Sequence, residues 1–334
     1  MADIDRLQQR IENLVELGKY MQSSDPEWLQ AKDRATGANA WFTDAHVDSA
    51  VRNIVSEYLQ QDKLQSWAAA YKLPTVARNI GIVMAGNIPL VGFHDFLCGY
   101  IAAHNLFLKL SSKDDVLLKQ LLARLAEIDP ESTSHITVAE RLNNCDAYIA
   151  TGSNNTARYF EQYFGKYPNI IRRNRTSVAV LDGNESDEQL DALAHDVHLF
   201  YGLGCRNVTQ LCVPEGYDFV RLLQTFRSYN HYADLNKYKN NYDYHLAIYL
   251  LNRVPYMSNE SLLMVENNMP FSAVSVLHYR YYSDRDALIS ELTASEDIQA
   301  IVGRGFMPFG SAQKPALSDY ADGIDTMQFL CNLQ

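Results

Sequence analysis

One cysteine stands in a setting that suits nucleophilic chemistry. Cys205 follows Gly202 and Gly204 in an expected turn between a helix and a strand, and Arg206 comes directly after it. Glycines let a backbone approach a ligand closely, and a neighbouring cation favours the thiolate over the thiol. A thiolate at the edge of a pocket attacks carbonyl carbons readily. The alternative is a small apolar residue that fills a turn, which is the usual role of a free cysteine.

Asn87, in the segment GNIP, is the second candidate. A carboxamide at the end of a strand, held by the rigid Pro89, is able to aim its N–H at a developing oxyanion. Asparagine is also a common turn residue, so a purely structural role is the alternative.

Histidines and one aspartate near these residues are expected to be structural. His94 and Asp95 are neighbours on a helix and point in different directions, which favours capping or packing. His195 and His198 lie one turn apart on a later helix, and a metal site there would need further ligands that the sequence does not provide. We therefore expect no metal.

The elements that position these residues follow a strand–turn–helix rhythm. Buried strands are expected at 80–84, 106–110 and 146–150, each followed by a polar turn and a helix. This pattern predicts a parallel sheet in an open α/β fold, with ligands at the carboxyl ends of the strands. The turns AGN, SSKD and TGSNNT would then offer helix N-termini to a pyrophosphate, although none is a GxGxxG fingerprint. Helix capping alone is the alternative.

A second unit is expected to begin near Ser177. Residues 177–183 form a predicted strand and turn, and 208–214 form another strand. Between them, Ser186 and Gln189 predict a capping box for a helix. Its apolar face is expected to consist of Leu190, Leu193, Val197 and Phe200.

Bulk composition limits the class of protein. The chain has 334 residues, 47% of them hydrophobic, and a net charge of -11, which argues against a nucleic-acid partner. No apolar run reaches the length of a membrane span, and scattered cysteines without metal-ligand spacing predict reduced thiols in a cytoplasm. Cys98 and Cys212 are expected in the core. The five cysteines are Cys98, Cys145, Cys205, Cys212 and Cys331.

Five ordered motifs resemble those of the bacterial acyl-CoA reductases, the LuxC-type branch of the aldehyde dehydrogenase superfamily. They are VMAGNIPLVGFHDFLC, LKLSSKD, ATGSNN, GLGCRNVT and MPFGSAQKPALSDYADG, and they span roughly residues 80–330. The resemblance implies an aldehyde dehydrogenase-like α/β fold with a Rossmann-type cofactor domain and an α/β catalytic domain. We expect these domains at 1–176 and 177–308. A C-terminal segment, 309–334, would return to the cofactor domain or to a partner subunit, the latter in a homodimer.

The resemblance also assigns roles to particular residues. Cys205 corresponds to the catalytic thiol and Asn87 to the oxyanion-hole asparagine. Lys109 and Ser111 correspond to residues that reach the adenosine ribose, and the PFG turn at 308–310 matches the late turn of the fold. The remaining expected cofactor-binding residues are Ala85, Gly86, Ser112, Lys113, Thr151, Gly152 and Ser153.

Two departures from the superfamily pattern bear on the reaction. The segment 172–183, RRNRTSVAVLDG, lacks the glutamate base that activates water in acid-forming aldehyde dehydrogenases. In the segment KLSS, Ser112 stands where NAD-preferring members often carry a glutamate, and Lys113 adds a cation. A 2′-phosphate is then not repelled, which favours NADPH.

The resulting hypothesis is an acyl-CoA reductase that uses NADPH and forms an aldehyde through a thioester on Cys205. The substrate would be a fatty acyl-CoA or an acyl carrier protein thioester. Residues 229–256 are rich in tyrosine, and they would wall an acyl channel or form ordinary core. Two other interpretations stay open. One is a cysteine-dependent acyltransferase or thioesterase, and the other is a non-catalytic nucleotide-binding protein on the same fold.

Overall fold

The computed structural model of the protein describes residues 2–333, which form two compact units. The first unit contains the described residues up to 174 together with those from 315 onward, and the second is Arg175–Lys314. The chain therefore leaves the first unit once and returns to it, with changeovers at 174/175 and 314/315, where the sequence had suggested 176/177 and 308/309.

The first unit is built on a parallel sheet whose strand order is β3-β2-β1-β4-β5. The chain moves outward from β1 through β2 to β3, then returns to pair β4 on the other side of β1. This reversal is a topological switch point, beside which open α/β sheets bind their ligands. The strands are β1 (Asn79–Val83), β2 (Asn105–Lys109), β3 (Ile136–Val138), β4 (Ala147–Thr151) and β5 (Asn169–Arg172).

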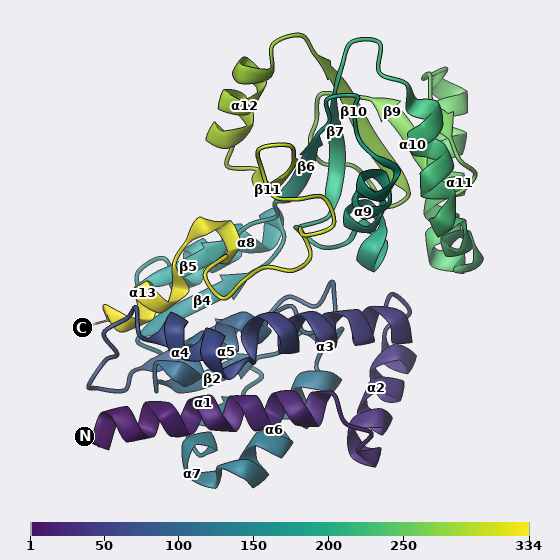
Figure 1. The fold of residues 1–334 in the computed structure, drawn as a ribbon. Helices are drawn as coiled ribbons and strands as arrows, with labels where there is room; N and C mark the ends of the chain where they lie inside the picture. Colours follow the sequence, from purple (N-terminus) through teal and green to yellow (C-terminus); the bar gives the residue numbers. More distant parts are fainter. Residues whose placement is uncertain (1, 334) are drawn as a thin grey trace. The chain divides into compact units, whose positions relative to one another are not determined.

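Helices cover this sheet and share one apolar core with it. The long helix α1 packs against α4, α5 and α6, and α2 packs against α3 and α6 (Figure 1). Leu14, Trp28 and Leu64 from these N-terminal helices join Ile80 and Ile82 of β1 in the core. The helices are α1 (Ala2–Met21), α2 (Pro26–Ala38), α3 (Asp44–Tyr58), α4 (Gln61–Ala68), α5 (Phe93–Ile101), α6 (Val116–Ile128), α7 (Pro130–Thr133), α8 (Asn154–Phe164), α13 (Thr326–Cys331) and the 3₁₀ turn η3 (Ala321–Gly323).

The C-terminal segment completes the first unit. The Trp67 indole N–H donates to the Tyr320 hydroxyl at 2.8 Å, and Leu317 and Leu330 lie in the core. Arg172, at the end of β5, forms a buried ion pair with Asp95 of α5 at 2.5 Å and donates to the Thr326 hydroxyl of α13 at 2.8 Å. Asp95 therefore has a packing role.

The second unit is built on a six-stranded sheet, in the order β11-β6-β7-β10-β9-β8, in which only β8 runs antiparallel to its neighbour. Its strands are β6 (Thr176–Val180), β7 (Val208–Pro214), β8 (Met257–Ser258), β9 (Leu263–Glu266), β10 (Val276–Tyr282) and β11 (Ile298–Gly303). Its helices are α9 (Asp187–His198), η1 (Leu199–Gly202), α10 (Phe219–Phe226), η2 (Arg227–Asp234), α11 (Asn236–Asn252) and α12 (Arg285–Ala294).

Side-chain alternation along β6 and β7 gives this sheet two apolar faces. Ala179 and Leu211 pack with α9 and α10, whereas Val178 and Cys212 pack with Leu288 and Leu292 of α12. Successive strand residues point to opposite faces, so helices are needed on both (Figure 1). Parallel strands buried on both faces appear as continuous apolar runs.

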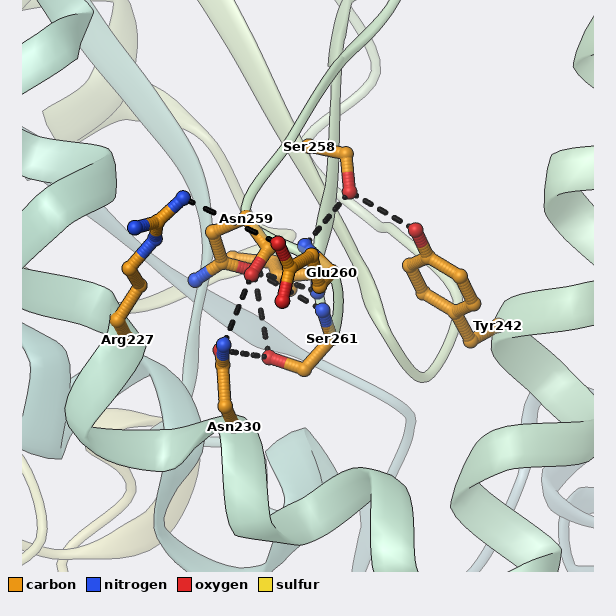
Figure 2. Close-up of polar contacts among 8 residues, drawn as sticks. Arg227, Asn230, Tyr242, Ser258, Asn259, Glu260 and Ser261 are labelled. Carbon is orange, nitrogen blue, oxygen red and sulfur yellow. Dashed lines mark hydrogen bonds and ion pairs between the residues drawn. The ribbon is translucent and has the colours of Figure 1, made fainter.

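The tyrosine-rich stretch at 229–256 is mainly structural. Tyr238 and Tyr242 are buried, whereas Tyr244 and Leu250 of α11 are exposed. The Tyr242 hydroxyl bonds the Ser258 hydroxyl at 2.8 Å, which ties α11 to the end of β8 (Figure 2). This stretch therefore contributes core and support for a hairpin.

The observed elements agree closely with those expected. The α/β class is confirmed, the predicted strand 208–214 is β7, and the capping box of Ser186 and Gln189 is present at the start of α9. One expectation was wrong: α9 ends at His198, so Phe200 lies beyond the helix that was predicted to carry it. Between residues 2 and 333, no helix combines the length and apolarity needed to cross a membrane.

Candidate functional site

The turns after β1, β2 and β4 lie at one edge of the first sheet. Val83 at the end of β1 pairs with Lys109 of β2 and with Ala150 of β4, so the three strands end at the same level. The expected cofactor residues 85–86, 109–113 and 151–153 therefore share the carboxyl edge at the switch point. This is where a dinucleotide binds in sheets of this order.

Gly86 allows the turns after β1 and β2 to touch. A Cβ atom at this position would lie 2.5 Å from the Ser111 Oγ and 3.2 Å from the Asp114 Cβ, so only glycine fits without displacing the second turn. Asn39, from the segment after α2, donates to the Lys113 carbonyl at 3.1 Å. The N-terminal helical region thus supports the turn after β2.

Asp114 is a residue of this edge that the sequence did not reveal. Burial raises the pKa of its carboxyl well above the usual range, while the backbone N–H groups of Leu90 and Val91 act in the opposite direction. These N–H groups belong to the turn that follows Asn87, and Leu90 has a left-handed φ of 57°. Asp114 therefore joins the two turns, and its place after the SSK motif was the only available signal.

Several of the expected side chains are exposed at this edge. Asn87, Lys109, Ser112, Lys113 and Ser153 are all exposed. Ser153 also caps α8, because its Oγ accepts from the Thr156 N–H at 3.3 Å. A capped helix start with further N–H groups still suits an anion, so capping and phosphate binding are compatible here.

In the second unit, the segment that leads into the Cys205 turn has a left-handed backbone conformation. Phe200, Tyr201 and Gly202 have φ values of 55°, 56° and 75°. The left-handed region costs a residue with a Cβ roughly 1–2 kcal/mol, so the surrounding structure must hold Phe200 and Tyr201 there. Cys205 itself is half-buried.

Asn207 closes this turn from within. Its Oδ1 accepts from the Gly204 N–H at 2.8 Å, and its backbone N–H donates to the Gly204 carbonyl at 3.0 Å. Its Nδ2 donates to three carbonyls at the end of α9, and these bonds satisfy groups that a helix end leaves without partners. The three acceptors are the carbonyls of Asp196 at 3.1 Å, Val197 at 3.3 Å and Leu199 at 2.7 Å.

Two further residues, Ser177 and Asp196, add to the hydrogen bonds around the Cys205 turn. The Ser177 hydroxyl of β6 donates to the Cys205 carbonyl at 3.1 Å. Asp196 accepts from the Gly310 N–H at 2.6 Å and from the Ala312 N–H at 3.1 Å, so it fixes the PFG turn beside α9. Burial raises the pKa of Asp196 to about 6. Asn207 and Asp196 were not predicted from the sequence, although an asparagine two residues after the cysteine is a turn signal.

Glu185 and His198 are poorly suited to act as a base toward Cys205. Cys205 is tied to Ser177 at the amino end of β6, whereas Glu185 accepts from the Asp182 N–H at 2.6 Å beyond the carboxyl end. A strand of this length separates the two ends by on the order of 15 Å. Burial lowers the pKa of His198 to about 4, and the ring stacks on Tyr229 with centroids 4.4 Å apart.

The sequence-predicted residues thus fall into two groups. The first unit brings together the cofactor turns and Asn87, and the second unit holds Cys205 and the PFG turn. His94 packs in the first unit, with its Nε2 3.0 Å from the Leu317 carbonyl and its ring 4.9 Å from that of Tyr58. Among residues 2–333, no three His, Cys, Asp or Glu side chains are grouped to hold a metal ion.

The sequence profile of the acyl-CoA reductase (LuxC) family matches residues 50–218, about half of the chain. The chain belongs to this family. The match includes the three turns of the first sheet and the Cys205 turn. No curated protein matches the chain by sequence.

Solved aldehyde dehydrogenases share the fold of this acyl-CoA reductase family member. Aldehyde dehydrogenase 21 from Physcomitrella patens, in complex with succinate, has a TM-score of 0.66 at 11% identity over 89% of this chain and 73% of its own. Succinic semialdehyde dehydrogenase from Streptococcus pyogenes, solved with NADP+, has a TM-score of 0.64 at 12% identity over 89% and 77%. An aldehyde dehydrogenase from Mycobacterium tuberculosis, solved with NAD+, has 0.62 at 13% over 85% and 70%.

The solved structures show the aldehyde dehydrogenase-like fold, and the family match supports the general chemistry. The chain is an oxidoreductase of acyl and aldehyde groups.

Proposed function

We propose that this acyl-CoA reductase reduces an acyl thioester to an aldehyde with NADPH and carries the acyl group on Cys205. The observation that carries the proposal is the Cys205 turn, which is held by buried hydrogen bonds at the end of β6 opposite Glu185. The first unit would serve as the cofactor domain and the second as the catalytic domain.

The chemistry begins with the Cys205 thiolate. It attacks the thioester carbonyl carbon, so that a new C–S bond forms and the bond to the sulfur of CoA or of an acyl carrier protein breaks. The Cys205 N–H donates to the developing oxyanion. After reduction of the acyl carbon, the Cys205 C–S bond breaks, the aldehyde is released and the thiolate is regenerated.

The first unit fits a dinucleotide at its sheet edge. The close approach at Gly86 and the capped start of α8 lie beside the switch point, as a bound pyrophosphate requires. Lys109 and Ser111 would reach the adenosine ribose, and Gly152 with Ser153 would face the pyrophosphate. Ser112 and Lys113 would accept a 2′-phosphate. When bound, NADPH supplies the hydride that reduces the acyl carbon.

The positions of Glu185 and His198 bear on the fate of the acyl group. Hydrolysis of a thioester needs a water polarised by a positioned base, an effect worth about 10²–10⁴-fold. Glu185 lies beyond the far end of β6, and His198 is buried with a lowered pKa. The thioester on Cys205 should therefore survive long enough to be reduced.

The test is intact-protein mass spectrometry after mixing the protein with acyl-CoA in the absence of cofactor. We expect a covalent adduct of acyl mass on Cys205 that persists, is discharged as aldehyde by NADPH and is reversed by free CoA. A parallel reaction with an acyl carrier protein thioester identifies the preferred donor. Rapid release of free fatty acid without NADPH would instead identify a thioesterase.

A further inference from the structure

The turn that carries Cys205 is closed by a buried asparagine side chain. Asn207 is 0% exposed, and its carboxamide bonds the Gly204 N–H on one side and the end of α9 on the other. The same residue closes the turn through its backbone bond to the Gly204 carbonyl. Cys205 and Arg206 are the two central residues of the turn that Asn207 closes.

The left-handed residues before the turn explain why the turn needs the hydrogen bonds of Asn207. Phe200 and Tyr201 are held in a conformation that costs free energy, and they connect α9 to Gly204. Asn207 bonds the carbonyls of Asp196, Val197 and Leu199 directly before this segment and the Gly204 N–H directly after it. The strained segment is therefore fixed at both of its ends by one carboxamide.

We propose that Asn207 is a positioning residue that fixes Cys205 for attack on the acyl carbonyl. The inference rests on the proposed function of Cys205 as the nucleophile. Asn207 acts through the backbone of the turn, with Ser177 holding the Cys205 carbonyl from β6. Attack on a bound thioester requires the sulfur to be placed within a fraction of an ångström, and a displacement of 1 Å can cost about 100-fold in rate. A small soluble alkylating agent makes no such demand.

The chain offers a matched control in Asn259. This residue is 1% exposed, and its Oδ1 accepts from the Leu262 N–H at 2.8 Å and the Ser261 N–H at 3.2 Å, closing the turn between β8 and β9 (Figure 2). Its carbonyl accepts from the Asn230 Nδ2 at 3.0 Å. Both asparagines are buried turn-closing residues of the second unit, but only Asn207 closes the Cys205 turn.

The experiment compares Asn207→Ala with Asn259→Ala in three measurements on the full chain. These are the thermal midpoint, the rate of Cys205 alkylation by iodoacetamide and the single-turnover rate of Cys205 acylation by acyl-CoA without cofactor. We expect both variants to lose thermal stability to a similar extent. Acylation should fall at least about tenfold in Asn207→Ala alone, while alkylation changes by less than about threefold.

Each outcome decides the inference. Equal acylation rates in the two variants would overturn it, as would parallel losses of acylation and alkylation in Asn207→Ala. If Asn207→Ala does not fold, Asn207→Ser takes its place, because it keeps a hydroxyl acceptor for the Gly204 N–H and removes the Nδ2 bonds to the end of α9. A selective loss of acylation in that variant supports the inference, and an unchanged rate refutes it. Absence of acylation in the unmodified protein would mean that the proposed function itself fails.

Discussion

In the first unit, the turns after β1, β2 and β4 present exposed side chains on short local turns, whereas in the second unit Cys205 lies in a turn closed by a buried asparagine. The exposed edge relies on a glycine contact, on helix starts that place backbone N–H groups, and on a hydrogen bond from the distant Asn39 to the Lys113 carbonyl. The cysteine turn relies on carbonyls eight to eleven residues upstream. A cofactor-binding surface functions with exposed side chains, whereas a nucleophile has to be fixed in position.

The largest effect is expected in the second unit. Cys205→Ala should abolish acyl labelling and aldehyde formation, a loss of about 10³-fold or more, because alanine has no sulfur with which to form the thioester. Cofactor binding, measured by fluorescence titration, should be unchanged. Cys212→Ala is the matched control: Cys212 is buried in β7, so its loss should cost about 1 kcal/mol of stability and leave the chemistry intact. Substantial aldehyde formation by Cys205→Ala would contradict the mechanism.

Asp196 and His198, which lie on α9 shortly before Cys205, are titratable groups whose contributions to stability respond oppositely to pH. Burial raises the pKa of Asp196 from 3.8 to about 6, so its contribution to stability is complete below pH 3.8 and is lost as pH rises through 6. Burial lowers the pKa of His198 from 6.5 to about 4, so its contribution is complete above pH 6.5 and is lost as pH falls through 4. Each shift corresponds to up to ~3 kcal/mol, and the two largely cancel between pH 4 and 6.

Single substitutions should therefore reveal opposite slopes. Relative to the unmodified protein, the free energy of unfolding of Asp196→Asn should rise from pH 4 to pH 6, and that of His198→Phe should fall. Urea unfolding across this range measures both. Parallel pH profiles for the three proteins would show that these two groups do not titrate as their burial requires.

The smallest effect concerns the exposed edge of the first unit. Ser112→Glu should reduce the preference for NADPH over NADH by about tenfold, because a carboxylate would face the 2′-phosphate. Gly86→Ala provides a second comparison. Its Cβ atom, 2.5 Å from the Ser111 Oγ, displaces the turn and should weaken the binding of NADPH and NADH to the same extent. Dissociation constants for the two cofactors distinguish these cases. Equal use of NADPH and NADH by the unmodified protein would refute the assignment of Ser112 and Lys113.

The sequence predicted elements well where burial is continuous. The run 80–84 became β1 at Asn79–Val83, since a strand covered on both faces consists of apolar residues throughout. The edge strand β3 was not predicted, because it has three residues, two of them exposed. The end of α9 was missed because Phe200 continues the apolar pattern while its backbone is left-handed.

In the candidate site, the sequence predicted those residues whose roles follow from local motifs. Cys205, Asn87 and the cofactor turns were accessible from motifs, since their residue types and order are local properties of the sequence. Asn207 and Asp196 were not, because their roles depend on bonds to α9 and to the PFG turn that only the folded chain creates. Asp114 depends in the same way on its contact with the turn after Asn87.

The return of residues 315–333 to the first unit has a consequence for biosynthesis. Trp67 and its partner Tyr320 are 253 positions apart, so the first unit cannot finish folding until residues 315–333 have left the ribosome. Residues 175–314 form a contiguous unit and are complete earlier, although domains usually fold in the order of their synthesis. The N-terminal unit must wait with the surface that receives Leu317, Tyr320 and Leu330 uncovered, which is the interval when a nascent chain most needs a chaperone.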